Sequence, residues 1–408
     1  MFDPIKASKE IKDSYIDYIT TTFDMADTDY EREFRKELQT DGMVASGPFL
    51  DIGGSYETGH TLRELIQAQK ASVLFESLEP VAEKERELKL DRPLYQHQET
   101  AMLKAGKGEN LVITTGTGSG KTESFLLPII NHLLREQEAG TLSAGVRAII
   151  IYPMNALAND QMKRMRALFK NYPQICYGVY NGNTEHTQSK ALAEYHRTYH
   201  DETGEPTDPA PNEIISREVM QERPPHILIT NYSMLEYMML RPKDDAVFSG
   251  AKLKFIVLDE AHIYKGATGM ETSLLMRRLR ARISEPDSVQ YILTSATLGG
   301  PDADGDILSF AEKLCGVAFQ RSGIIRSTEK RPAMEDFLDF APALFEELQR
   351  SPDISSVLDR YHADFAPGGS EDEKLYALFL HSRLFALLRK VAHQPITVAQ
   401  LCQALSEI

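Results

Sequence analysis

A run of small residues followed by a lysine, TTGTGSGKTES at 114–124, has the composition of an anion-binding loop. Its three glycines let the backbone turn with its amide groups inward, and a helix that follows would offer its positive amino terminus. A lysine can then neutralise phosphate while a threonine hydroxyl ligates magnesium. We therefore expect a bound ATP·Mg²⁺ along this segment, at Thr115, Gly116, Thr117, Gly118, Ser119, Gly120, Lys121 and Thr122.

Two carboxylates end an apolar run in KFIVLDEAH, residues 254–262. We expect Asp259 to hold the metal through water, and Glu260 to orient or deprotonate an attacking water. An Asp-Glu pair after a strand is by itself compatible with a solvated loop, but the glycine-rich loop upstream favours the catalytic interpretation. His262 would connect this site to a neighbouring strand end, with Ser295 and Thr297 as its hydroxyl partners.

The elements that would position these groups are short β-branched runs, each followed by a loop and usually by a helix-compatible stretch. They lie at 110–114, 146–152, 175–180, 226–230, 254–259 and 291–295. Strands that alternate with helices predict an α/β fold with a mostly parallel sheet and helices on both faces. In such sheets ligands bind at the carboxyl ends of the strands.

The flanking segments differ in composition from this α/β core. We expect a charge-rich helical accessory leader over 1–85, the α/β domain over 86–325, and a helical region over 326–408. An insertion at about 185–225 interrupts the domain and contains the Pro, Gly and acid-rich loop 201–212.

Net charge is −15, which argues against a general nucleic-acid coat protein. Basic residues nevertheless gather in two segments, and each can be a local phosphate track or a solvated helix face. The first segment holds Lys163, Arg164, Arg166 and Lys170, and the second holds Arg277, Arg278, Arg280 and Arg282.

No run of about 18 apolar residues and no signal-peptide core is present, so we expect a cytoplasmic protein without membrane contact. Cys176, Cys315 and Cys402 lie far apart without CxxC spacing. This spacing argues against a disulfide framework and a zinc site, and it predicts free, mostly buried thiols.

Three ordered motifs carry a family resemblance: GTGSGKT at 116–122, DEAH at 259–262 and TSAT at 294–297. They resemble motifs I, II and III of the superfamily 2 helicases of the DExH kind over roughly residues 90–320, which implies a RecA-like P-loop fold. RPLYQHQ at 92–98 resembles the Q motif, which implies that Gln98 reads the adenine edge with Tyr95 near the base. The resemblance also implies that His262, with Ser295, Ala296 and Thr297, couples the ATP state to movement.

Three further stretches resemble the segments that line a nucleic-acid track in this family: YPMNALANDQ (152–161), YNGNT (180–184) and the residues from Ile229 to Leu240. Short polar groups at strand ends suit hydrogen bonds to sugar and phosphate, although any one of them can be a turn or cap residue. The predicted contacts are Pro153, Asn155, Asn159, Gly182, Asn183, Thr230 and Asn231.

Two downstream stretches narrow the resemblance. The sequences at 264–283 and 296–317 are similar to bacterial helicases related to the MrfA DNA-repair enzymes, and to the large helicase components of Druantia or DISARM-like phage-defence systems. The resemblance implies a DNA helicase or translocase. An RNA helicase, or a regulatory or scaffold protein that binds ATP without turnover, remain alternatives.

Helicases of this superfamily use a second RecA-like domain that supplies an arginine finger, and no candidate follows TSAT within the 408 residues. We therefore expect a piece of a longer polypeptide, or a partner in trans. Because arginine fingers contribute roughly 10³–10⁵ in turnover, this chain alone should bind ATP and hydrolyse it very slowly.

Overall fold

The structure is a computed structural model of the 408-residue chain. It describes residues 3–23, 25–40, 42–50, 56–79, 88–116, 118–200, 204–248, 251–296, 299, 301–328, 330, 338–351, 353–361, 370–392 and 395–406. The chain divides into two compact units. One comprises residues 56–329, and the other combines residues 1–55 with residues 330–408.

An eight-stranded sheet in which every pair is parallel forms the centre of the 56–329 unit, with strand order β11-β4-β10-β9-β5-β8-β6-β7. The six runs expected as strands are strands, so the predicted α/β fold with a parallel sheet is confirmed. The strands are β4 (Leu111–Thr114), β5 (Ala148–Ile151), β6 (Tyr177–Tyr180), β7 (Glu213–Ile214), β8 (Ile227–Thr230), β9 (Phe255–Leu258), β10 (Gln290–Ser295) and β11 (Ile324–Arg326).

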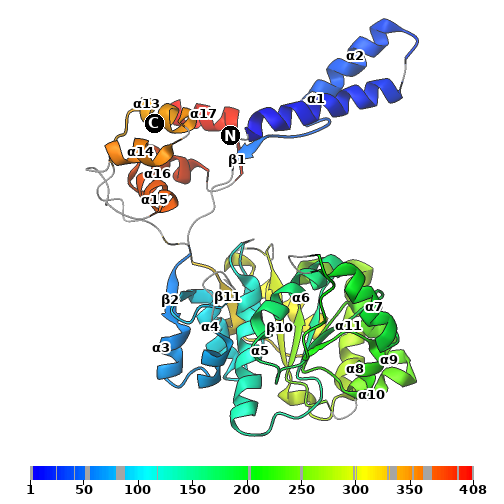
Figure 1. Cartoon of the computed structure of the whole chain (residues 1–408). Helices are drawn as coiled ribbons and strands as arrows, with labels where there is room; N and C mark the ends of the chain where they lie inside the picture. Colours follow the sequence, from blue (N-terminus) through cyan, green and yellow to red (C-terminus); the bar gives the residue numbers. More distant parts are fainter. Residues whose placement is uncertain are drawn as a thin grey trace. The chain divides into compact units, whose positions relative to one another are not determined.

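Helices cover both faces of this sheet (Figure 1). Successive strand residues alternate between the two layers, so that Ile113 packs with α4, α5 and α6 while Val112 packs with α9, α11 and α12. Burial on both faces is why the strands are continuous apolar runs. The helices are α3 (Leu62–Gln67), α4 (Gln96–Ala105), α5 (Lys121–Glu138), α6 (Asn155–Phe169), α7 (Gln188–Thr198), α8 (Arg217–Glu222), α9 (Tyr232–Leu240), α10 (Asp245–Phe248), α11 (Gly266–Arg282) and α12 (Asp304–Cys315).

Short 3₁₀ turns complete this unit: η1 (Val73–Leu78), η2 (Pro242–Asp244), η3 (Ala261–Ile263), η4 (Pro286–Ser288), η5 (Pro301–Ala303) and η6 (Arg321–Gly323). Of the free cysteines here, Cys315 is buried and Cys176 half-buried, whereas Cys402 in the other unit is exposed, against expectation.

The domain boundary expected at residue 85 differs from the division in the structure. Strand β2 (Thr58–Thr61) pairs antiparallel with β3 (Pro93–Tyr95), and Leu62 and Leu65 of α3 are buried in the core beneath α4 and α5. Residues 56–79 therefore belong to the α/β unit, because their apolar side chains complete one of its layers. The insertion at 185–225 likewise contains two helices and the edge strand β7, which its polar composition did not predict.

The second unit is mainly helical, as expected for the segments before and after the α/β core. Its small apolar cluster joins Leu344, Leu348, Val357, Leu358 and Leu378. It also contains strand β1 (Phe49–Leu50) paired with β12 (Ile396–Thr397), a strand in a region where only helices were expected. The helices are α1 (Pro4–Thr22), α2 (Thr28–Gln39), α13 (Pro342–Arg350), α14 (Ile354–Arg360), α15 (Glu371–His381), α16 (Arg383–Val391) and α17 (Val398–Ser406).

None of the helices in the part of the chain that the structure describes is long and apolar enough to span a bilayer.

Candidate active site

The glycine-rich loop connects the carboxyl end of β4 to the first turn of α5. Gly118 and Gly120 have φ of 74° and 73°, a left-handed conformation that favours glycine. A methyl group at position 120 would also collide with the Gln98 amide, so this position accepts only glycine. Inside the turn the Ser119 and Thr115 hydroxyls lie 2.7 Å apart, while Thr117 lies outside the described residues. The loop is thus fixed at its base and delivers Lys121 as the first residue of α5.

The start of α4 holds this loop from beside it. The Gln98 side chain accepts from the Tyr95 amide at 2.9 Å and donates to the Gly120 carbonyl at 3.1 Å. His97 Nε2 lies 2.8 Å from the Ser119 carbonyl oxygen, and burial lowers the pKa of His97, which favours a neutral ring that donates from Nε2. Gln98 therefore positions the phosphate loop, and the expected reading of adenine by Gln98 stays a prediction.

Three aromatic contacts near the loop were not predicted from sequence. The Tyr95 and His97 rings stack with centroids 5.5 Å apart, and Tyr56 meets both rings edge-on. His97 and Tyr56 have no motif of their own, although His97 stands between the two Q-motif residues that were chosen. Tyr56 comes from the segment assigned to the leader, so its place beside the loop depended on the tertiary fold.

The carboxylates follow β9, in the centre of the sheet. Thr294 of the adjacent strand β10 donates its hydroxyl to Asp259, and its oxygen accepts from the Glu260 amide at 3.2 Å. Burial raises the pKa of Asp259 above its ordinary value, a nearby Glu260 charge raises it further, and the Thr294 hydrogen bond and Lys121 oppose the shift. Thr294 thus orients both acids, a role that sequence reasoning missed.

Lys121 and Glu260 bring the two motifs together. The Lys121 ammonium lies 3.0 Å from Glu260 Oε1, and their side chains are 12% and 24% exposed. Glu260 itself has φ 48°, which is unusual for a residue with a side chain and turns the chain sharply after the strand. The phosphate-loop lysine and the predicted general base therefore occupy one partly buried site at the carboxyl ends of β4 and β9.

His262 extends this site toward β10. Its Nδ1 lies 3.1 Å from the Ser295 hydroxyl oxygen and 3.3 Å from Glu260 Oε2. Glu260 Oε2 is buried and makes no hydrogen bond within the described part of the chain. Ala296 follows β10 half-buried, and Thr297 lies outside the described residues. The structure brings His262 and Ser295 together, and their coupling role stays a prediction.

The residues expected to contact nucleic acid divide into two groups. Asn231 caps α9 by accepting from the Met234 amide at 2.8 Å, and its side-chain amide donates at 2.9 Å to Asn155, the first residue of α6. Thr230 is 1% exposed and donates to the Tyr180 carbonyl at 2.7 Å, so its hydroxyl does not face a bound strand. The exposed group contains Asn159, Gly182 and Asn183, with Pro153 half-buried beside them.

Most of the clustered arginines are engaged within the protein. Arg166 forms a double hydrogen bond to Glu213, whose side chain is 1% exposed, and lies against the Tyr199 ring. Arg164 pairs with Glu123 at the start of α5. On α11 the same holds for Arg278 with Glu236, Arg280 with Asp287 and Arg282 with Asp245. In this conformation these arginines pair with neighbouring carboxylates, which agrees with the solvated helix face; the phosphate track stays an untested alternative.

The residues present fit a nucleoside triphosphate with magnesium. The turn leaves space around Gly118, where an added methyl group would meet no atom, and Lys121 is a partly buried cation paired with the Glu260 carboxylate. Thr122 and Asp259 offer the hydroxyl and carboxylate oxygens that magnesium prefers. Within the described part of the chain, no group of three or more His, Cys, Asp or Glu side chains is arranged to hold a metal ion.

Residues 95–304, which include GTGSGKT, DEAH and TSAT, match the DEAD/DEAH box helicase family, and the chain belongs to this family. The expected resemblance to superfamily 2 helicases is thereby confirmed. Among curated proteins the chain is similar to Druantia protein DruE of Escherichia coli (strain UMEA 4076-1), with 34% identity over 414 residues, 79% of this chain and 22% of DruE. It is also similar to the ATP-dependent helicase HRQ1 of Saccharomyces cerevisiae, with 29% identity over 213 residues, 51% of this chain and 16% of HRQ1.

Among solved structures the chain is similar to the DUF1998 helicase MrfA bound to DNA and AMPPNP, with 22% identity and a TM-score of 0.46 over 68% of this chain and 31% of that one. The chain thus spans less than a quarter of the length of the curated relatives DruE and HRQ1.

Proposed function

We propose that this chain is the ATP-binding motor half of a helicase or translocase that acts on DNA in phage defence or repair, in the cytoplasm. The observation that carries the proposal is the Lys121–Glu260 pair, at 3.0 Å, which unites the phosphate loop with the DEAH carboxylates at the carboxyl edge of a parallel sheet. A lysine and a potential general base converge there with a second acid, Asp259.

The side chains suggest a division of labour on ATP. Lys121 exchanges its carboxylate partner for phosphate oxygens, and the amides of the loop bind the same phosphates. Thr122 and Asp259 would hold magnesium, which when bound neutralises charge on the phosphates. Glu260, released from Lys121, accepts a proton from the attacking water. His262, which contacts both Glu260 and Ser295, would transmit the change in Glu260 to the end of strand β10.

Asn159 in helix α6, and Gly182 and Asn183 just after strand β6, are exposed and suit a nucleic-acid strand bound through its sugar-phosphate backbone. Asn155 and Asn231 would join them if their mutual hydrogen bond opens. The DNA assignment rests on the resemblance of residues 264–283 and 296–317 to bacterial DNA-repair helicases, because backbone contacts alone do not distinguish DNA from RNA.

Turnover in this proposal needs an arginine from a second RecA-like domain, in the same polypeptide or a partner. Since such arginines contribute roughly 10³–10⁵ in rate, the 408 residues alone bind ATP·Mg²⁺ and hydrolyse it slowly. Closure of the two domains on ATP would move them along a single strand.

The test compares ATP hydrolysis by the full-length protein with single-stranded DNA, with single-stranded RNA and without nucleic acid. Strong stimulation by DNA is the expected result. Stimulation by RNA alone would replace the DNA assignment with an RNA helicase, and ATP binding without turnover under every condition would make the chain a nucleotide-controlled scaffold. The variant Asn159→Ala/Asn183→Ala should weaken stimulation, whereas Lys190→Ser, on the exposed surface of α7, should not.

A further inference from the structure

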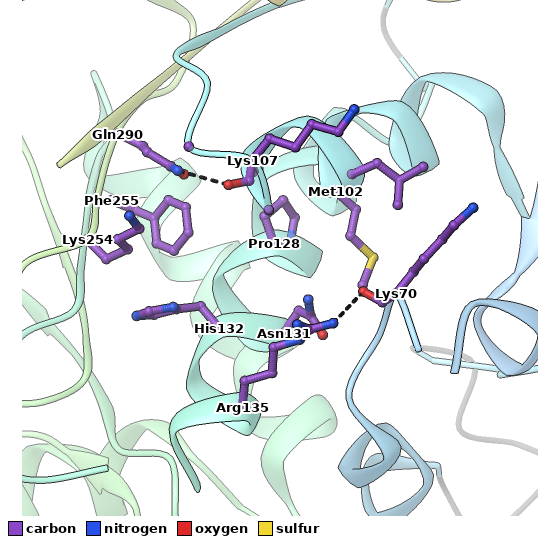
Figure 2. A pocket seen from close by; sticks show the side chains of 14 residues that line it. Lys70, Met102, Lys107, Pro128, Asn131, His132, Arg135, Lys254, Phe255 and Gln290 are labelled. Carbon is purple, nitrogen blue, oxygen red and sulfur yellow. Dashed lines mark hydrogen bonds between the residues drawn. The ribbon is translucent and has the colours of Figure 1, made fainter. Parts of the chain in front are cut away.

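A second cavity lies at the amino ends of β9 and β10, where Phe255 and Gln290 begin these strands (Figure 2). We call it the rear pocket. Its volume is about 660 Å³, within the range of roughly 300–1,000 Å³ that is typical of small-molecule sites. It is lined by Lys70, Met102, Leu103, Ala105, Gly106, Lys107, Gly108, Pro128, Asn131, His132, Arg135, Lys254, Phe255 and Gln290.

The rear pocket is separate from the ATP site although the same elements build both. Helices α4 and α5 carry Gln98 and Lys121 near their first residues, whereas the pocket is lined by later residues of each helix. Strands β9 and β10 start at the pocket and end at the catalytic carboxylates and Ser295. A ligand in the rear pocket would therefore not compete for the space of ATP.

The charge of the rear pocket is opposite to that of the chain. Its lining contains four residues with a formal positive charge, Lys70, Lys107, Arg135 and Lys254, and no Asp or Glu, in a chain with a net charge of −15. Their combined field favours an anion, because charges of one sign that line a cleft concentrate the opposite ion.

The hydrogen bonds of two of these cations leave their charge uncompensated. Arg135 donates to the Gln69 and Lys70 carbonyls at 3.0 Å, and Lys254 donates to the Ser288 carbonyl at 3.0 Å. All three acceptors are neutral carbonyl oxygens. Burial lowers the pKa of Lys254, which an anion nearby would reverse. This contrasts with α11, where three arginines have carboxylate partners.

The carboxylate nearest to this set in sequence is already committed. Glu136 lies 3.5 Å from His132 Nε2, but it also pairs with Arg147 at 2.9 Å, and that arginine is fully buried. Glu136 therefore compensates Arg147 and is not a counter-ion for the pocket cations.

An apolar floor lies between the cations. Met102 and Phe255 are each 2% exposed, and Pro128 is buried beside them. The Phe255 ring is held edge-on by the His132 ring, with centroids 5.6 Å apart. These side chains form the apolar base of the pocket, and Figure 2 draws Lys70, Lys107 and Arg135 around it. A flat ring that enters the pocket would meet this base while an attached anionic group reaches those cations.

We propose that the rear pocket is a second ligand site, which takes a small phosphorylated compound of the nucleotide class, with its phosphate near Lys70, Lys107 and Arg135 and its ring on the apolar floor. Lys254, on the opposite side of the pocket, adds to the positive field. The site is independent of the motor function proposed above. A nucleic-acid strand fits it less well, because the pocket is a half-open concavity at the edge of the sheet opposite to the polar strand ends.

The test measures binding of radiolabelled AMP by equilibrium dialysis in EDTA, with Lys121→Ala in every protein so that the glycine-rich loop does not contribute. We expect saturable binding of one AMP per chain. Adding Lys70→Ser/Lys107→Ser should lower the affinity at least about tenfold, since two charge-assisted contacts are lost. Lys254→Met, which keeps most of the aliphatic stem, should also lower it. Unchanged melting temperatures verify that the variants are folded.

The matched control is Lys190→Ser/Lys243→Ser, which removes two exposed lysines outside the pocket and should leave AMP binding unchanged. Absence of saturable binding, or an equal loss in the control, would overturn the proposal. Displacement of AMP by a single-stranded oligonucleotide at lower concentrations than unlabelled AMP would also overturn it, and would assign the pocket to nucleic acid. Because ATP·Mg²⁺ and hydrolysis are not involved, this outcome is separate from that of the proposed function.

Discussion

The ATP site and the arginine-rich helix α11 use charged side chains in opposite ways. On α11, Arg278, Arg280 and Arg282 each contact a carboxylate on an adjacent element. In the proposed ATP site two acids share one lysine: Lys121 pairs with Glu260, while the half-buried Asp259 has a raised pKa and one oxygen of Glu260 lacks a hydrogen bond within the described part of the chain. Paired charges stabilise the fold, whereas acids without a full set of partners indicate a ligand.

Among the arginines that pair with carboxylates, we expect the largest effect on stability for Arg166, the partner of Glu213. Arg166→Ala should lower the free energy of unfolding by about 3–5 kcal/mol, because it leaves the buried Glu213 carboxylate without a cation, with the Tyr195 hydroxyl as its remaining side-chain donor. Denaturant unfolding measures this loss. ATP binding by the folded fraction should be unchanged. If the variant had normal stability but bound nucleic acid poorly, Arg166 would be assigned to phosphate binding instead.

Glu260→Gln should have the next largest effect, in the proposed ATP site. The change removes the carboxylate that pairs with Lys121 and also repels phosphate, so affinity for ATP·Mg²⁺ should rise roughly tenfold, or about 1.4 kcal/mol. Titration calorimetry measures the affinity. A weaker affinity in the glutamine variant would mean that the pair positions Lys121 for ATP and does not compete with it.

Asp259→Asn should raise the melting temperature of the chain by a few degrees while weakening ATP·Mg²⁺ binding. Burial raises the pKa of Asp259 above its ordinary value of 3.8, so the wild type loses stability as pH rises from that value toward the raised pKa, and the asparagine variant does not. The gap in melting temperature should therefore widen as pH rises from about 3.8 and level off above the raised pKa. A gap that narrows with rising pH would contradict the raised pKa.

The smallest effect is expected for Arg278→Ala. Its pair with Glu236 is substantially exposed, at 44% and 35% for the two side chains. The free energy of unfolding should therefore change by less than about 1 kcal/mol. DNA binding, measured by fluorescence anisotropy, should also be unchanged. A clear loss of DNA binding would show that this arginine leaves its partner for phosphate.

The fold was largely predictable because strands buried on both faces are continuous apolar runs, as in β5, β8 and β9. The strands that were missed, such as β7 and β11, have two or three residues and form by pairing with an edge already present. The segment 56–79 was assigned to the leader because its charged residues obscure the apolar pattern of residues such as Leu62 and Leu65, which pack into the core.

The candidate site was predictable where residue type limits the chemistry, as for the loop glycines, Lys121 and the Asp259-Glu260 pair. The positions of Thr294 and His97 were not, since their contacts depend on which strands and helices are neighbours. For the same reason the burial of Thr230 and the carboxylate partners of the arginines became visible only in the folded chain.

The central claim is that the glycine-rich loop and the DEAH carboxylates form one ATP site, and the most direct test is magnesium-dependent ATP binding by the Lys121→Ala variant. Calorimetric titration with ATP in the presence and absence of Mg²⁺ isolates this component. Our account predicts that the magnesium-dependent affinity falls at least about 100-fold, or about 2.7 kcal/mol, while Lys190→Ala binds like the wild type. An unchanged affinity in Lys121→Ala would contradict it.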